Sequence, residues 1–322
     1  MMNCTNDRFR TPVAVGSPLR IIGLEDKNLF IGSCFAEHVG KRFAEARLRT
    51  MVNPLGVMYN PVSIARLLTT QEADPERDFV LYKGMWHTWL GDSSLSRLDA
   101  DECRQATDEA LSSMHTELKR ADNLFLTLGT SRYYIYKETY EVVANCHRLP
   151  SIEFEEYDLS VEEIVEALDA ALTSLHEDNP RMQVIFTVSP YRYSKYGMHE
   201  SQLAKARLLL AVDKLQTLHS DWISYFPAYE LLLDDLRDYR FYEEDMLHPS
   251  DQAVDYIWQR LSDEWMSDEV RSYLARWEPI RRSLAHRPLH PESPEYVSFR
   301  EHTQAQLDKL RDDYPHLSFP SV

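Results

Sequence analysis

Short apolar runs alternate with longer segments of helical period over the first 265 residues. The run NLFIG at 28 to 32 predicts a strand, and Phe35, Val39 and Phe43, which are four residues apart, predict a helix directly after it. The same pattern predicts core strands near 48 to 52, 123 to 129, 183 to 190 and 222 to 227, and helices near 62 to 69, 101 to 120, 151 to 179, 199 to 219 and after 250.

A helix is therefore predicted between nearly every two strands that follow each other in the sequence. This order is typical of an α/β fold with a mostly parallel five-stranded sheet and helices on both faces. Residues 74 to 99 predict an inserted strand or hairpin, and RYYIY with YEVVA predicts a second small hairpin after the strand at 123 to 129. From about 266 onward prolines and charges dominate, with one helix expected near 295 to 312. We expect a domain over 1 to 265 and a C-terminal helical extension over 266 to 322.

The charge balance limits the expected partners. The chain has 322 residues, 43% of them hydrophobic, and its 35 basic and 52 acidic side chains give a net charge of −17. This charge argues against broad binding to nucleic acid or to an anionic membrane surface. Ten of the acids lie in 151 to 179, which we interpret as a solvated helix face near a helix N-terminus.

The same composition suggests a location. The mean hydropathy is −0.45, and no apolar run reaches the 18 residues that a membrane span requires. The first residues lack the basic start and apolar centre of a signal peptide, so a cytoplasmic protein is expected.

The cysteines and histidines predict neither a metal site nor a cofactor. Cys4, Cys34, Cys103 and Cys146 are widely spaced, without a CxxC pair, and disulfides are not expected in the cytoplasm. The histidines show no HxH or HExxH spacing.

Polar clusters follow the predicted core strands. Ligands of an open parallel sheet bind beyond the carboxyl ends of its strands, so we expect these clusters to form one site. They are Gly32-Ser33-Cys34, Asn53 to Asn60, Gly129-Thr130-Ser131, Ser189 to Arg192, and Asp245 to His248.

These clusters carry a family resemblance. The stretch IGSCFAEHVG resembles the signature of the GSCFA family, and NPLGVMYNP, TLGTSRYY, VANCHRLP, TVSPYR and DMLHPS resemble the same family in the same order, within residues 8 to 265. The family is placed in the SGNH/GDSL hydrolase superfamily. The resemblance implies a flavodoxin-like, three-layer fold, a nucleophile after the first strand, oxyanion donors from later loops, and an Asp-x-x-His pair near the C-terminal end.

Asp245 and His248 fit the Asp-x-x-His pair. The aspartate would orient the imidazole as a general base; alternatively, Asp245 caps the next helix and His248 packs beside it. An ungapped match to the superfamily pattern places Cys34 on the nucleophile, and a helix N-terminus would lower its thiol pKa. Ser33 remains an alternative nucleophile, because the superfamily normally uses serine. A further alternative is that Cys34 only fills a small apolar gap and does no chemistry.

The oxyanion donors match less well. The backbone N–H groups of Cys34, Gly56 and Gly129 are candidates, and LGTS places Ser131 where the superfamily has an asparagine. Asn53 or Asn60 could supply the missing amide; alternatively, each only forms a turn before a proline.

Further residues are candidates for substrate binding. They are Trp86 and His87 on the inserted hairpin, His147 beside Arg148, and Arg192. Packing is the alternative for the histidines. Arg192, Lys205 and Arg207 could bind an anionic group or could form salt bridges with the abundant acids.

Three functions remain open on the sequence. The first is an ester hydrolase that removes acetyl or similar short acyl groups from a hydroxylated small molecule or glycan. The second is an acyltransferase with the same Cys/Ser-His-Asp triad, and the third is a binding or scaffold protein that has lost turnover. A homo-oligomer through the C-terminal extension is a further expectation.

Overall fold

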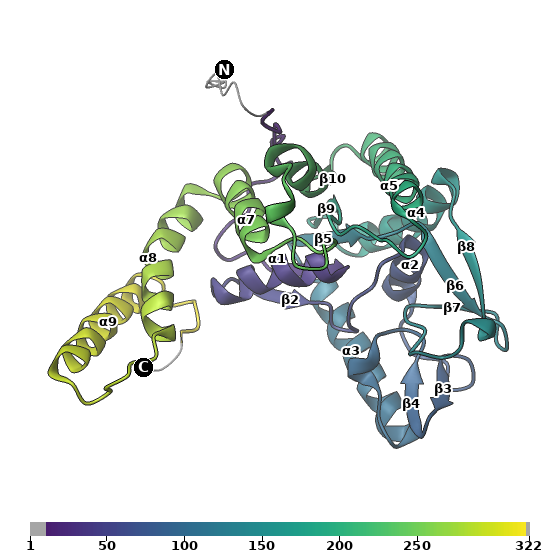
Figure 1. Cartoon of the computed structure of the whole chain (residues 1–322), viewed down its shortest axis with the longest axis horizontal. Coiled ribbons are helices and arrows are strands. Elements are labelled where there is room, and N and C mark those ends of the chain that lie inside the picture. The colour runs from purple at the N-terminus through teal and green to yellow at the C-terminus, as the bar shows by residue number, and fades with distance from the viewer. Residues whose placement is uncertain (1–10, 320–322) are drawn as a thin grey trace.

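The computed structural model of the chain describes residues 11 to 319, so Cys4 lies outside the described residues. A five-stranded parallel sheet forms its centre, in the order β10-β9-β5-β1-β2 (Figure 1). This confirms the predicted α/β fold. The strands are β1 (Asn28–Gly32), β2 (Thr50–Val52), β5 (Asn123–Leu128), β9 (Gln183–Val188) and β10 (Ile223–Tyr225).

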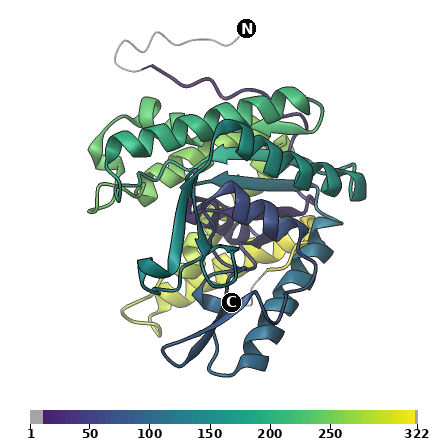
Figure 2. The same cartoon turned by 90° about the vertical axis from the view of Figure 1, so that its right-hand side faces the viewer.

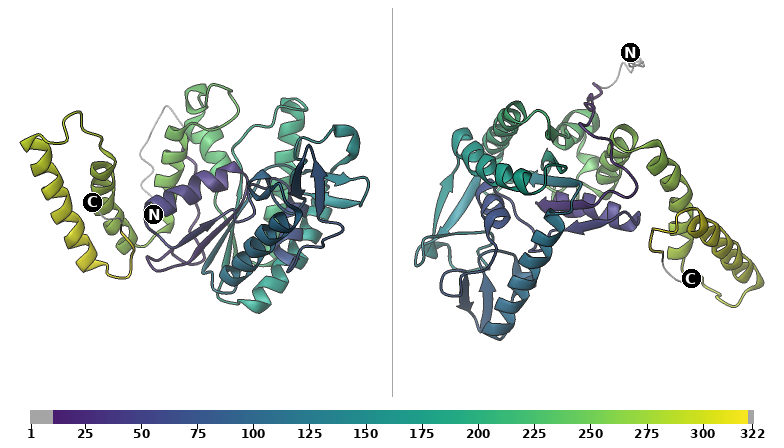
Figure 3. Two further views of the ribbon diagram at one scale, coloured as in Figure 1. Left: turned by 90° about the horizontal axis from the view of Figure 1, so that it is seen from below. Right: turned by 180° about the vertical axis from the view of Figure 1, so that it is seen from behind.

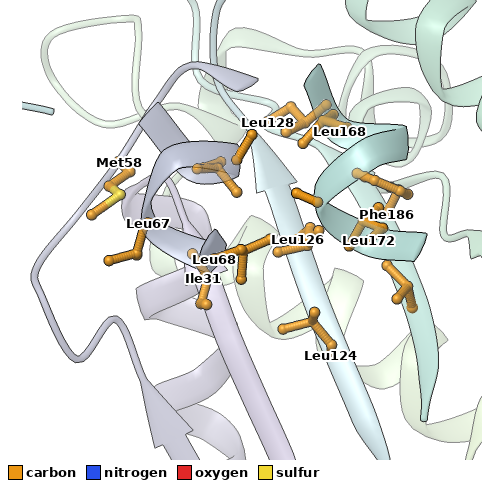
Figure 4. Packing of buried hydrophobic residues seen from close by; sticks show 14 of the residues in the cluster. Ile31, Met58, Leu67, Leu68, Leu124, Leu126, Leu128, Leu168, Leu172 and Phe186 are labelled. Atoms are coloured by element: carbon orange, nitrogen blue, oxygen red, sulfur yellow. The ribbon is translucent and has the colours of Figure 1, made fainter. Parts of the chain in front are cut away.

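Side chains alternate between the two faces of this sheet, as strand geometry requires. Leu124 and Leu126 of β5 lie in one hydrophobic cluster with the helices α2 (Pro61–Thr69), α3 (Ala100–Leu118), α4 (Val161–Asp178) and α5 (Met198–Leu218). Phe125 lies in a second cluster with α1 (Cys34–Glu45), α7 (Asp251–Trp265) and α8 (Asp268–Ala285). Figure 4 shows the first cluster, where Leu67 and Leu68 of α2 and Leu168 and Leu172 of α4 pack onto the sheet. Because both faces are covered, the fold has three layers, as Figure 2 shows.

The helices match the predicted periodicity with few exceptions. Their bounds are α1 Cys34–Glu45, α2 Pro61–Thr69, α3 Ala100–Leu118, α4 Val161–Asp178, α5 Met198–Leu218, α6 Ala228–Glu230, α7 Asp251–Trp265, α8 Asp268–Ala285 and α9 Pro294–Asp313, with a π-helical stretch at Leu231–Leu236.

Two antiparallel insertions lie outside the central sheet. The hairpin of β3 (Phe79–Tyr82) and β4 (Met85–Thr88) confirms the strand or hairpin expected in 74 to 99. The second insertion is larger than predicted, because β6 (Arg132–Tyr136) pairs with both β7 (Glu141–Val143) and β8 (Phe154–Asp158).

Strand β8 corrects the prediction of one acidic helix over 151 to 179. Its acids are not only a solvated face, since Glu156 and Asp158 form ion pairs of 3.3 and 3.7 Å with Arg132 on β6. The helix itself begins at Val161, after a capping box between Ser160 and Glu163.

The C-terminal extension contains two long helices, one more than the sequence predicted. Val270, Tyr273, Trp277 and Ile280 form a buried stripe along α8, which continues through Pro279. Helices α8 and α9 lie at the opposite end of the molecule from the β3–β4 hairpin (Figures 1 and 3). The boundary at 265 stays a prediction. Within residues 11 to 319, we find no helix with the length and apolarity of a membrane span.

Candidate functional site

A tight turn joins β1 to α1 and presents Cys34 as the first residue of the helix. Gly32 has a φ of +141°, and a Cβ there would overlap the backbone carbonyl of Thr127 on β5. The Ser33 N–H donates to the same Thr127 carbonyl over 3.1 Å. Glycine is therefore required at this position for the close approach of the turn to β5.

Ser33 and Cys34 differ in exposure. Ser33 is the N-cap of α1, is only 1% exposed, and its Oγ accepts a hydrogen bond of 3.3 Å from the Phe35 N–H. Cys34 is half-buried, and no other residue among 11 to 319 accepts a hydrogen bond from its own N–H. The thiol is thus the more accessible of the two candidate nucleophiles.

The protonation of Cys34 corrects a prediction from the sequence. Burial raises the pKa of the thiol above its ordinary value, and this exceeds the lowering by the Phe35 N–H and by the positive charge of Lys205. The helix N-terminus therefore does not make Cys34 a ready thiolate. A nucleophilic Cys34 requires a proton acceptor.

Asp245 and His248 form a hydrogen-bonded pair in the loop before α7. The distance from His248 Nδ1 to Asp245 Oδ2 is 2.5 Å, and Asp245 Oδ1 accepts the N–H groups of Leu247 and His248 over 2.8 and 2.9 Å. These hydrogen bonds, led by the His248 N–H, lower the pKa of Asp245 to about 2. With Nδ1 as donor to the carboxylate, Nε2 is left as the acceptor. The alternative that Asp245 caps the helix is wrong, because Ser250 caps α7.

Tyr191 contacts this pair from the loop after β9. Its ring centroid lies 4.3 Å from that of His248, and the next residue, Arg192, donates its N–H to the Leu247 carbonyl over 3.0 Å. The pKa of Tyr191 is raised, first by burial and then by the negative charges of Cys34 and Asp245. Tyr191 therefore lies within electrostatic range of both the thiol and the pair. The structure shows no hydrogen bond from His248 to Ser33 or Cys34 within residues 11 to 319.

The predicted oxyanion donors Gly56, Gly129 and Ser131 are already occupied. Their N–H or O–H groups donate to Asn53 O at 2.8 Å, to Tyr59 O at 2.7 Å and to Asp158 Oδ1 at 2.5 Å, respectively. These three assignments are wrong for this conformation, since a donor engaged within the fold is not available to a developing oxyanion. Of the predicted oxyanion donors, the backbone N–H of Cys34 is therefore left available.

Asn53 and Asn60 both form hydrogen bonds that stabilise turns, and Asn53 also has an unpaired side-chain amide. Asn53 has a φ of +41°, and its Oδ1 accepts the Gly32 N–H over 2.9 Å, while its buried Nδ2 has no partner in the described chain. Asn60 caps α2 by accepting the Ser63 N–H over 2.8 Å. Both therefore shape their turns, as the alternative interpretation proposed. Through its bond to Gly32, the Asn53 side chain also contacts the first residue of the Gly32 to Cys34 turn.

The histidines of the insertion are packing residues. His87 and His147 stack at 4.6 Å, are 8% and 4% exposed, and hydrogen-bond Ser96 and Ser93. Burial lowers the pKa of both, that of His147 to about 4, so both are neutral. The substrate-binding prediction for them is therefore not supported. Trp86 is half-buried on β4, where its backbone N–H donates to the Arg97 carbonyl at 2.7 Å. In the described part of the chain it makes no hydrogen bond to Cys34 or His248.

The three cations near β9 have different surroundings. Arg207 forms a 2.6 Å ion pair with Asp158, as one alternative predicted. Arg192 lies 5.9 and 5.5 Å from the ring centroids of Tyr239 and Tyr242 and has no carboxylate partner in the described chain. Lys205 corrects the salt-bridge interpretation, because its buried Nζ donates to the carbonyls of Gly129 and Ser189 instead.

The sequence analysis considered Lys205 only as an anion-binding or salt-bridge residue, and it gave Tyr191 no role of its own. TVSPYR contains Tyr191, but the ring contact with His248 depends on the loop geometry. Among residues 11 to 319 no group of three or more His, Cys, Asp or Glu side chains is arranged to hold a metal ion.

Comparisons with known proteins agree with the resemblance. The model of the GSCFA family matches residues 27–261. The chain belongs to the GSCFA family. A second model, described as GSCFA domain protein, C-terminal domain, matches residues 277–321 of this GSCFA protein. No curated protein matches it.

Solved structures show distant similarity to this GSCFA protein. One is a candidate platelet activating factor from Streptococcus pneumonia, at 14% identity and a TM-score of 0.39, covering 74% of this chain and 83% of that chain. Another is an acetyl xylan esterase from the rumen bacterium Butyrivibrio proteoclasticus, at 13% identity and a TM-score of 0.37, covering 80% of this chain and 66% of that chain.

Proposed function

We propose that this GSCFA protein is an ester hydrolase of the SGNH type that removes short acyl groups from a hydroxylated small molecule or glycan. The observation that carries the proposal is the Asp245–His248 hydrogen bond of 2.5 Å, beside the loop after β9 and at the same edge of the sheet as Cys34. An imidazole oriented in this way has Nε2 free to accept a proton, which a general base requires.

The chemistry proceeds in two steps. His248 takes the thiol proton while Cys34 Sγ attacks the ester carbonyl, and the alcohol leaves with that proton as the acyl thioester forms. Water, activated by His248, then releases the carboxylic acid and restores the thiol. The unpartnered Cys34 N–H is the donor for the oxyanion of both tetrahedral intermediates.

Exposure supports Cys34 over Ser33 as the nucleophile. The Ser33 side chain is buried, and its oxygen already accepts the Phe35 N–H, which stabilises the start of α1. Using Ser33 would therefore require the N-cap to break. The half-buried Cys34 needs no such rearrangement.

Turnover of short-chain nitrophenyl esters and acetylated sugars, with and without added alcohols, tests the proposal. We expect hydrolysis in water alone, its loss in Cys34→Ala, and only a reduction in Ser33→Ala. Cys146→Ala is the matched control, because it removes a second half-buried thiol that the proposed mechanism does not use. Turnover only with an added alcohol would assign acyl transfer instead, and no turnover with either would favour the binding function. Loss in Ser33→Ala with activity retained in Cys34→Ala would make the protein a serine esterase.

A further inference from the structure

A groove lies between the helix that begins with Cys34 and the helix that follows His248. It has a volume of about 690 Å³ between α1, α7 and α8, which is within the usual range of ligand sites. Helix α7 begins with Asp251, three residues after His248, and Asp251 lines the groove. The groove therefore reaches within three residues of the candidate general base.

The charges that line this groove cancel one another. Four basic and four acidic side chains line it, although the whole chain has a net charge of −17. Arg42 of α1 pairs with Asp255 of α7 at 2.9 Å, and Glu45 of α1 pairs with Arg281 of α8 at 3.5 Å. The other four charged side chains are each paired at 2.7 to 3.9 Å. A charged ligand would find no unpaired opposite charge among these lining residues, so the groove favours an uncharged polar ligand.

Uncharged side chains of α7 complete the lining. Trp258 is half-buried, and its ring packs edge-on against Phe43 with the centroids 5.0 Å apart, which fixes its orientation. The Gln259 side chain is exposed and forms no hydrogen bond within the described chain. An aromatic ring, an amide and paired charges together offer an apolar face with many donors and acceptors. A sugar presents the complementary groups, namely C–H faces and hydroxyls.

One stripe of α1 leads from Cys34 to the groove. Cys34, His38 and Arg42 are four residues apart, so they are neighbours on one face of the helix, with about 5 to 6 Å between successive Cβ atoms. Side chains of a helix lean toward its N-terminus, so His38 leans toward the turn that carries Cys34. His38 is half-buried, and its ring makes no hydrogen bond within the described chain.

His38 is suited to bind a hydroxyl. Burial and then the charge of Arg42 lower its pKa, and these effects exceed the opposing effects of Asp251 and Glu37. His248 lowers the pKa of His38 further. A neutral imidazole has one donor and one acceptor, which matches a hydroxyl group.

We propose that the alcohol half of the substrate is an uncharged glycan that lies along α1, with His38 hydrogen-bonded to a hydroxyl beside the ester and the neutral groove holding the further sugar units. The position of the ester rests on the proposed function, because it requires attack by Cys34. The affinity of the groove for uncharged glycans does not.

A change of charge inside the groove tests this location. Gln259→Lys and Gln259→Glu add opposite charges at an exposed lining residue, so both variants should fold. The measurement is kcat/KM for acetylated trisaccharides, which are neutral maltotriose, anionic trigalacturonic acid and the cationic trimer of glucosamine. We expect the wild type to prefer the neutral ester. Relative to that ester, the anionic one should gain about twofold to fivefold in Gln259→Lys and lose as much in Gln259→Glu, and the cationic one should do the opposite.

Gln105→Lys is the matched control for these variants. Gln105 is exposed on α3 and does not line the groove, so the three esters should keep their wild-type ratios. A wild type that prefers a charged ester would overturn the proposal. Ratios that respond to neither change at Gln259 would overturn it as well.

His38→Phe tests the end of the site next to Cys34. Phenylalanine keeps an aromatic ring but removes both nitrogen atoms. The substrates are glycerol monoacetate and propyl acetate, which share the acyl group and the carbon chain and differ in two hydroxyls. We expect the wild type to prefer the glycerol ester, and His38→Phe to reduce this preference about threefold to tenfold, the usual contribution of one hydrogen bond. A purely structural role of His38 would slow both esters equally, and that result would refute its contact with the hydroxyl.

Binding without turnover separates this proposal from the proposed function. In Cys34→Ala labelled with nitrogen-15, the indole N–H signal of Trp258 is followed during titration with the three unesterified trisaccharides, and Trp258→Phe identifies the signal. Maltotriose should shift it to saturation, and the charged trimers should bind more weakly. Such binding without hydrolysis of any ester would refute only the proposed function. Hydrolysis without any effect of a trisaccharide on Trp258 would refute only the proposed glycan site.

Discussion

At Cys34 two physical effects of opposite sign determine the chemistry of one thiol. A helix N-terminus stabilises a thiolate, and the sequence alone suggested that this effect would dominate. Burial disfavours the charge more strongly, so the pKa of Cys34 is raised. The sequence shows where a helix begins, but it does not show how much protein covers its first side chain.

The raised pKa predicts slow alkylation of Cys34 at neutral pH. A thiol whose pKa exceeds its ordinary value of about 8.5 stays protonated until the solution is more alkaline. The iodoacetamide rate at Cys34 should therefore lie below that of a free cysteine at pH 7 and should still increase above pH 9. The measurement uses peptide mapping at several pH values, with N-acetylcysteine as the reference. A Cys34 that reacts faster than the reference at pH 7 would contradict the burial argument.

Asp245 leads to a second prediction for a single residue. Its carboxylate fixes the His248 ring and accepts two backbone N–H groups, which the neutral amide of Asn replaces poorly. Asp245→Asn should reduce kcat for a short-chain ester by about 10² to 10⁴, the usual contribution of an oriented general base. Glu244→Gln, a change at an exposed neighbour, should leave kcat unchanged. Equal rates in the wild type and Asp245→Asn would remove this pair from the mechanism.

At the level of elements, the hydrophobic pattern predicted the strands and helices whose burial is visible in their own residues. Strands β5 and β9 are mostly apolar and are buried on both faces, so length and flanking residues sufficed to place them. Strand β8 was missed because its acids are paired across to Arg132, which no local pattern reveals. Helix α8 was missed because Pro279 normally ends a helix, whereas here the buried stripe outweighs the lost hydrogen bond.

The residues of the candidate site also divide into those that the local sequence predicted and those that it did not. Asp245 and His248 are three residues apart, so their pairing could be predicted from the sequence. The hydrogen bond from the Gly129 N–H to the Tyr59 carbonyl joins two loops that are distant in the sequence, so it could not be predicted. The same is true of Lys205, whose partners are backbone atoms without any sequence signature.

The turn between β1 and α1 provides a prediction for an element junction. In Gly32→Ala a Cβ would meet the Thr127 carbonyl and would also require an unfavourable φ of +141°. We expect a loss of about 1 to 3 kcal/mol in the free energy of unfolding from backbone strain, with more from the overlap. Gly84→Ala is the control, since Gly84 has a φ of +79° but open space around its Cβ position. Urea denaturation should show a larger loss for Gly32→Ala than for Gly84→Ala.

At the level of the whole molecule, the extension is attached to the far end of the helix that carries Cys34. Tyr273 and Trp277 of α8 donate to the carbonyls of Ala46 and Glu45, at 2.9 and 2.7 Å. These carbonyls lie at the C-terminal end of α1, about 18 Å along the helix from Cys34 at 1.5 Å per residue. A groove of about 690 Å³ runs between α1, α7 and α8. The homo-oligomer through the extension stays a prediction, for which light scattering of the full chain is the direct measurement.

This attachment predicts that stability and catalysis respond differently to a change at Trp277. The side chain is 2% exposed and belongs to the same hydrophobic cluster as α1 and α7. Trp277→Ala should therefore lower the free energy of unfolding by about 3 to 5 kcal/mol, in one cooperative transition. Turnover of a short-chain ester at low temperature should be unchanged, because the hydrogen bond of Trp277 to α1 lies at Glu45, at the opposite end of the helix from Cys34. Leu289→Ala, at a residue 93% exposed, is the control with no expected effect on either measurement. A separate early transition in Trp277→Ala would show instead that α8 and α9 unfold as an independent unit.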